Sequence, residues 1–176
     1  IMSRGRRKKF KLRFGVKPDT IRSIISLVFL ALCVITLVSF FAPSYDLNSK
    51  IQHFLRLYFG QSSVLIPLIL RSFGILFFDH INIKYKEARV FVGLLLLLFS
   101  LSGVFHIFRN ANEAYEIALE GKGGGLVGYK IAGFLSSGIS KFGAATVLIL
   151  AIIGSLFLIF NVSFNNLIEF FSENEF

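Results

Sequence analysis

Long runs of apolar residues dominate the hydropathy pattern of this chain. Four runs, residues 24–41, 62–78, 90–108 and 142–160, contain at most one Asp, Glu, Lys or Arg each. At about 1.5 Å per residue, helices of this length cross most or all of a hydrocarbon layer about 30 Å thick. The pattern therefore predicts an all-α membrane protein with four transmembrane helices.

The first run could also be the apolar part of a secretory signal, because basic residues precede it. However, its eighteen uncharged residues are too many, and the FFAPSYDLN at its end offers no small-x-small cleavage site. A composition of 55% hydrophobic and only 16% charged residues also points to lipid as the solvent. We therefore expect a retained membrane helix.

Two segments between the runs are predicted to be helices at the membrane surface. In residues 46–58, Leu47, Ile51, Phe54 and Tyr58 recur at helical spacing between polar positions. The second segment, residues 126–140, follows a polar loop and the glycine run 123–125, which predicts a hinge. Both surface helices are placed on the same external side.

Lys and Arg are distributed unequally between the two sides of the predicted bundle. Residues 1–22 hold nine of them and the loop 79–89 holds three, whereas the opposite side holds six. Because basic flanks resist translocation, the N-terminus, the middle loop and the C-terminus are predicted to be cytoplasmic. A basic arm is expected to attract anionic lipid, and DNA binding is its alternative function. Its cations are Arg4, Arg6, Arg7, Lys8, Lys9, Lys11 and Arg13.

A short phrase occurs twice, as FGQSSVLI at 59–66 and FGAATVLI at 142–149. Aligned from these points, residues 59–77 and 142–160 share eight identities in nineteen positions. Each half would then contain a span, an external helix and a returning span, with the joints at Phe59, Gly60, Phe142 and Gly143. The pattern favours two repeats about an axis along the membrane normal over a chance match of apolar letters.

Small residues recur at every fourth position after the polar loop. Such a stripe lets helices approach closely, so we predict that it serves helix packing and oligomerisation. Its members are Gly124, Gly128, Ala132, Ser136, Ser140 and Ala144.

Arg71 is the one charged residue within a predicted span. An unpaired cation in the bilayer costs several kcal/mol, so its side chain either snorkels to the inner surface or meets a subunit interface or hydrated groove. With Pro67, it is the only feature that favours a polar transport path.

Residues that carry catalysis, cofactors or metals form no recognisable site. Gly123, Gly125 and Gly128 match the dinucleotide fingerprint in spacing, but no predicted strand precedes them. The three histidines, His53, His80 and His106, lie in separate segments, where we expect them at the membrane interface, and Cys33 is the only cysteine. We therefore predict no catalytic, cofactor-binding or metal-binding residue in this chain.

Several segments follow one another in a specific order: a basic arm, FFAPSYDLN, FGQSSVLIP, GKGGGLVG and FGAATVLILAIIGSLFLIFNVS. With the four spans, this order resembles the N-terminal four-transmembrane domain of FtsK/SpoIIIE-type bacterial DNA translocases over about residues 20–165. The chain departs from the family at FNVS, where Thr-Gly is frequent, and after Pro43, where a second proline is frequent.

The resemblance implies an anchoring and oligomerising domain, without enzymatic activity of its own, of a translocase that acts in cell division and chromosome segregation. It also implies the bacterial inner membrane, the division septum, and lipid, further copies in a hexamer and other division proteins as partners. ATP and DNA would be bound by a motor domain not present here, beyond Phe176. The expected organisation is an arm at 1–20, a membrane domain at 21–164 and a tail at 165–176. A stand-alone channel or transporter subunit is the alternative.

Overall fold

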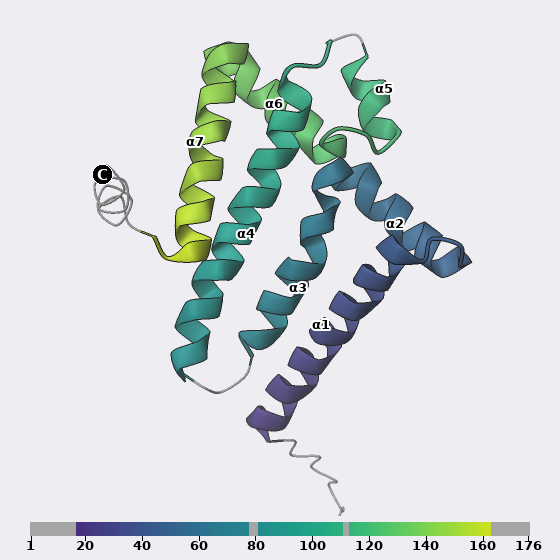
Figure 1. Ribbon diagram of the computed structural model, residues 1–176, viewed down its shortest axis with the longest axis vertical. Helices are drawn as coiled ribbons and strands as arrows, with labels where there is room; N and C mark the ends of the chain where they lie inside the picture. Colours follow the sequence, from purple (N-terminus) through teal and green to yellow (C-terminus); the bar gives the residue numbers. More distant parts are fainter. Residues whose placement is uncertain (1–16, 78–80, 111–112, 163–176) are drawn as a thin grey trace, which may run out of the picture.

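The computed structural model describes residues 17–77, 81–110 and 113–162 (Figure 1). Every regular element in these ranges is a helix, which confirms the predicted all-α class. The elements are α1 Pro18–Phe41, α2 Asp46–Phe59, the 3₁₀ helix η1 Gly60–Leu65, α3 Ile66–Ile75, α4 Ile81–Ile107, α5 Ala114–Leu119, α6 Gly125–Ile139 and α7 Lys141–Phe160.

Four helical stretches are long and apolar enough to cross a bilayer, as the sequence predicts: Pro18–Phe41, Asp46–Ile75, Lys86–Ile107 and Lys141–Phe160. The second stretch changes direction at Gly60, so α2 lies across the end of the bundle and only η1 and α3 run beside the other spans (Figure 1). Together η1 and α3 are about 27 Å long at the usual rises of the two helix types. Pro67 has no amide hydrogen to donate to a carbonyl four residues earlier, which explains the 3₁₀ entry into α3.

The spanning helices form a row in the order α7, α4, α3, α1 (Figure 1). α4 packs against α7 and α3, and α3 packs against α1. The helices α2, α5 and α6 lie over one end of the bundle along the helix axes, and we call this the capped end (Figure 1). The outermost helices of the row, α1 and α7, therefore each have one side that no other spanning helix covers.

The interior is narrow and built largely from small side chains. At the capped end, α4, α6 and α7 bury a cluster of Ile107, Ala132, Ala144, Ala145 and Leu148. A second cluster of Ile69, Leu94 and Leu98 joins α3 to α4. Many large apolar side chains point outward instead, among them Leu27 at 70% and Phe142 at 81% exposure.

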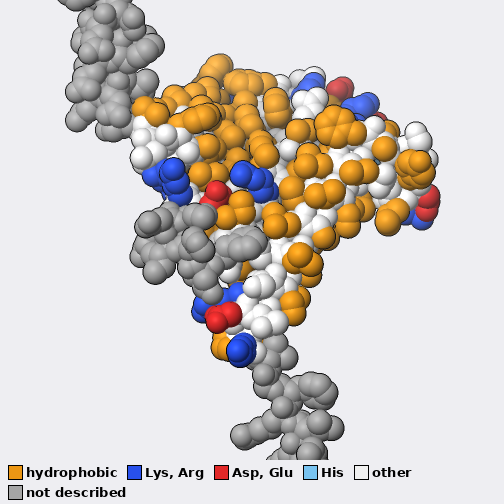
Figure 2. Space-filling view, turned by 60° about the horizontal axis from the view of Figure 1, so that its bottom comes forward, with side chains coloured by type: hydrophobic (Ala, Val, Ile, Leu, Met, Phe, Trp, Pro, Cys, Tyr) orange, Lys and Arg blue, Asp and Glu red, His pale blue; other side chains and the backbone are white. Residues whose placement is uncertain are grey.

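Hydrophobic side chains cover a broad, continuous area of the surface, and charged ones form only small groups (Figure 2). A soluble monomer rarely exposes apolar area on this scale. In a bilayer the same surface is solvated by lipid, while the helices satisfy their own backbone hydrogen bonds. The fold is therefore that of a multi-pass membrane protein.

Candidate functional site

Two backbone segments contact each other directly at the capped end. Residues 56–61, where α2 passes into η1, touch residues 121–125, which include the glycine run before α6, and we call this contact the glycine crossing. The amide of Gln61 donates to the carbonyl oxygen of Gly123 at 2.8 Å. A Cβ on Gly60 would lie 2.0 Å from that oxygen, and one on Gly125 would lie 2.6 Å from the Gly60 nitrogen.

Conformation and space both require glycine here. Gly60, Gly121, Gly123 and Gly125 have φ angles of +57°, +68°, +61° and +62°, a region that other residues rarely adopt. The sequence predicts a hinge at 123–125 before a helix, and in the structure this run directly precedes α6, which begins at Gly125. The glycines are buried, because they allow one backbone to pack directly against another.

The start of α6 rests on α4 through two further glycines. A Cβ on Gly124 would lie 1.8 Å from the carbonyl oxygen of Ser102, and one on Gly128 would lie 2.2 Å from the same oxygen. Both distances are far below any real contact of a Cβ atom. The two helix backbones therefore meet at a separation that only glycine permits.

His106, near the end of α4, joins the glycine run to α5 by two hydrogen bonds. Its Nδ1 accepts from the amide of Gly124 at 3.2 Å, and its Nε2 lies 2.8 Å from the carbonyl oxygen of Ala114. A carbonyl oxygen only accepts, so this geometry assigns the neutral imidazole with the proton on Nε2. The sequence places the three histidines at the membrane interface, whereas His106 is 3% exposed and holds the backbone together.

The predicted stripe of small residues divides into two parts. Gly124, Gly128, Ala132 and Ala144 are buried between helices of the same chain, so they pack helices but present no surface to another copy. Ser136 is half-buried and Ser140 is exposed. The four buried positions therefore serve packing within the chain, and oligomerisation through the stripe stays a prediction.

Two further close helix crossings use glycines outside the predicted stripe of small residues. A Cβ on Gly74 of α3 would lie 3.3 Å from the Ser26 carbonyl oxygen of α1, and one on Gly93 of α4 would lie 3.1 Å from that of Ser155 in α7. Each crossing uses one small residue from each helix, so neither helix alone shows a repeating pattern. Only pairing distant segments of the sequence could have revealed them.

The two Phe-Gly pairs do not occupy equivalent positions, although the sequence places both at joints. Gly60 lies between α2 and η1 with a positive φ. Gly143 is inside the first turn of α7, and the preceding joint is Ser140, with φ +81°, whose hydroxyl accepts from the Gly143 amide at 3.4 Å. The likeness of the two phrases therefore does not extend to the geometry of the joints.

Arg71 lies toward the end of the bundle opposite the capped end. Arg71 is exposed on α3, four residues or about 6 Å before the helix ends at Ile75, and it makes no ion pair with a described residue. An Arg side chain spans this distance, which favours snorkelling. Nearby in the row, Arg89 of α4 donates to Asn161 Oδ1 after α7. The basic arm, from Arg4 to Arg13, and the tail 165–176 lie outside the described residues.

Side-chain clusters and glycines are the features of the described ranges that bear on metal and dinucleotide binding. No cluster of three His, Cys, Asp or Glu side chains occurs there. The amides of two of the dinucleotide-like glycines already have backbone partners, since Gly125 donates to the carbonyl oxygen of Lys122 at 3.2 Å and Gly128 donates to that of Gly124 at 3.0 Å. A pyrophosphate would have to displace the backbone that fills the space beside them.

The fold and its packed capped end define a class of protein: a multi-pass helical membrane domain whose distant segments are held together at one end. Residues 18–172 match the family described as the 4TM region of DNA translocase FtsK/SpoIIIE. The chain belongs to this family, as the order of its segments predicts.

Curated relatives agree with this membership. The chain is 29% identical over 143 residues to the DNA translocase FtsK of Mycobacterium tuberculosis (strain CDC 1551 / Oshkosh), covering 81% of the chain and 17% of that protein. It is 29% identical over 155 residues to DNA translocase FtsK of Caldanaerobacter subterraneus subsp. tengcongensis, covering 83% and 22%. The Mycobacterium leprae protein of the same name is 26% identical over 143 residues, covering 81% and 16%. The chain thus spans less than a quarter of these relatives. No solved structure matches it.

Proposed function

We propose that this chain is the membrane-anchoring and oligomerising domain of a DNA translocase that acts in cell division and chromosome segregation. It lies in the bacterial inner membrane with both termini in the cytoplasm, and it holds an ATP-driven motor at the division septum. The observation that carries the anchoring role is the family match over residues 18–172 of a domain with four apolar spans. Bringing copies together would raise the effective concentration of their motors and favour a hexameric ring.

The open row of spanning helices supports self-association. Only 22% of the residues in the most apolar part of α1 and of α7 are buried, against 50% in α4. The two sides of the row differ, so a contact between α7 of one copy and α1 of the next would be head-to-tail. Such heterologous contacts close into rings when the rotation between copies permits.

Three glycines of the described residues have open space where a Cβ would stand, and one of them, Gly154, supports the same proposal. A Cβ on Gly133, Gly138 or Gly154 would meet nothing within 4 Å. Glycine inside a helix is less favourable than alanine by about 1 kcal/mol, so a position that packs against nothing gains nothing in return. Close approach of a helix from another copy would account for Gly154, which lies within the spanning helix α7.

Replacing Gly154 tests this role without disturbing the internal crossings. Gly154→Leu should reduce self-association, measured by energy transfer between labelled copies in proteoliposomes, at least severalfold. Ile149→Leu, on an exposed position of the same helix about 140° around its axis from Gly154, is the matched control and should leave it unchanged. Equal association of both variants with the unaltered chain would contradict the proposed α7 contact.

The translocase assignment has a separate test. The coding sequence beyond Phe176 should contain, after a linker, a Gly-Lys-Ser/Thr phosphate-binding loop. A stop codon at that point would contradict it and favour a stand-alone membrane protein.

A further inference from the structure

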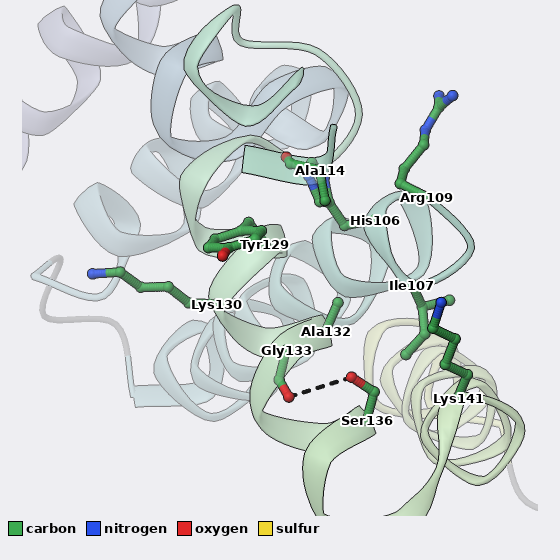
Figure 3. Close-up of a pocket in the computed structure, with 10 residues that line it drawn as sticks. All are labelled: His106, Ile107, Arg109, Ala114, Tyr129, Lys130, Ala132, Gly133, Ser136 and Lys141. Atoms are coloured by element: carbon green, nitrogen blue, oxygen red, sulfur yellow. Dashed lines mark hydrogen bonds between the residues drawn. The ribbon is translucent and has the colours of Figure 1, made fainter. Parts of the chain in front are cut away.

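A cavity of about 370 Å³ opens at the capped end, between the last turn of α4, α5, α6 and the first turn of α7 (Figure 3). This volume lies within the range of small-ligand sites, about 300–1,000 Å³. Its walls include apolar groups from three elements, Ile107, Ala114 and Ala132, all of them buried. The hydrogen bonds of His106 to Ala114 and Gly124 fix one wall.

The cations around this cavity have no acidic partner among the described residues. Arg109, Lys130 and Lys141 line it, all three are exposed, and no Asp or Glu lines it with them. None of the three forms an ion pair within the described part of the chain. By contrast, Lys50 pairs with Asp46 and Lys122 pairs with Glu120, each at 2.7 Å.

The three side chains can turn toward a ligand at the mouth of the cavity. In Figure 3 the Lys141 side chain extends toward Ile107, whereas Arg109 and Lys130 extend outward. Long, unpaired Lys and Arg side chains change rotamer readily, so a negatively charged group at the mouth would attract all three. Without such a group, three like charges around one opening repel each other.

The position of the cavity relative to the bilayer limits the kind of ligand that it can bind. α4 ends at Ile107 and α7 begins at Lys141, so the cavity lies where two spanning helices reach the membrane surface. Phe134 and Phe142, 80% and 81% exposed, follow the lining residues Gly133 and Lys141 in the sequence and add apolar surface to α6 and α7. A ligand here meets cations at its outer end and apolar surface at its inner end.

We propose that this cavity binds the phosphate of an anionic amphiphile, and specifically the headgroup of an anionic phospholipid in the leaflet at the capped end. Arg109, Lys130 and Lys141 neutralise the phosphate, while Ile107 and Ala132 contact the first apolar part of the lipid. Basic pockets between membrane helices are known to bind anionic headgroups. A free phosphate ion offers the same charge but lacks the apolar part.

The chain contains no Trp, so a single introduced Trp reports on its own surroundings. Phe142→Trp places this reporter next to Lys141, and Phe54→Trp, on exposed α2, is a reporter remote from the cavity. The full chain with either substitution is reconstituted in phosphatidylcholine vesicles that contain brominated phosphatidylglycerol or brominated phosphatidylcholine. Quenching of each reporter then gives the relative affinity of its site for the anionic lipid.

With Phe142→Trp we expect a preference for phosphatidylglycerol of about tenfold, which falls to about twofold or less when Arg109→Gln, Lys130→Gln and Lys141→Gln are combined. The matched control combines Lys50→Gln, Arg56→Gln and Lys122→Gln, which removes the same charge from the same end and should retain the preference. All six positions are exposed, and helical circular dichroism verifies the fold of each variant.

Equal preference at the two reporters, or equal loss in the two triple variants, would overturn the proposal, because surface charge alone would then explain the attraction. Displacement of the lipid by millimolar inorganic phosphate would overturn the lipid as the source and assign the site to a soluble phosphate. Retention of the lipid against phosphate supports the headgroup site.

Discussion

Two glycines of α6 provide a direct test of the packing at the capped end. They lie five residues apart in one helix, yet their surroundings are opposite. A Cβ on Gly128 would lie 2.2 Å from the Ser102 carbonyl oxygen, whereas one on Gly133 would meet nothing within 4 Å. Gly128→Ala and Gly133→Ala therefore raise the helix propensity by the same amount. Only Gly128→Ala introduces a clash with a neighbouring helix.

The expected magnitudes follow from these surroundings. Each Ala favours the helix by about 1 kcal/mol relative to Gly. At position 128 the clash is with backbone, so α6 and α4 must separate, and overpacking of this kind costs about 3 kcal/mol at the upper end of its usual range. We expect Gly128→Ala to lower the free energy of unfolding by about 2 kcal/mol and Gly133→Ala to raise it by up to about 1 kcal/mol.

The assay is equilibrium unfolding of the purified chain in mild detergent. SDS is titrated in, and the loss of helix is monitored by circular dichroism. The difference between the two variants, about 3 kcal/mol, is larger than the usual error of such titrations. If Gly128→Ala were as stable as the unaltered chain, or if both variants shifted equally, the close contact of α6 with α4 would be refuted.

Three further pairs of substitutions test separate parts of the structure by the same titration. His106→Ala should lower the free energy of unfolding by at least about 2 kcal/mol, since two buried backbone groups lose their partner, while exposed His53→Ala should change it little. Asn161 has φ +58°, so Asn161→Val should cost about 1–2 kcal/mol more than Asn161→Gly. The buried Ser72 hydroxyl has no partner, so Ser72→Ala should be neutral or stabilising, whereas Ser63→Ala removes a 2.7 Å bond to the Gly60 carbonyl oxygen and should cost about 1 kcal/mol; equal effects would contradict the assigned contacts.

The spanning helices could be predicted from the sequence because each is encoded locally. A continuous apolar run such as residues 142–160 needs no tertiary information to be recognised, and α7 extends from Lys141 to Phe160. The amphipathic period of residues 46–58 likewise corresponds to α2, Asp46–Phe59. Length and period are properties of one segment, and lipid imposes them directly.

The capped end could not be predicted, because its structure depends on which distant segments meet. Flexibility is the local property of glycine, so the run alone predicts a hinge, whereas the close approach of residues 56–61 depends on a distant segment. His106 appeared to be one of three scattered histidines, and its partners lie 8 and 18 residues away. The cavity lined by Arg109, Lys130 and Lys141 joins three elements whose charges look unrelated along the chain.

The central claim is that the chain crosses the membrane four times, with the capped end outside the cytoplasm and the loop before α4 inside it. Single cysteines introduced as Lys50→Cys, Lys122→Cys or Lys86→Cys, with Cys33→Ala to remove the native thiol, can be probed with a membrane-impermeant maleimide. We predict that the cysteines at 50 and 122 are labelled in intact cells and that the one at 86 is labelled only after permeabilisation. Labelling at 86 in intact cells, or a different accessibility of 50 and 122, would contradict the account.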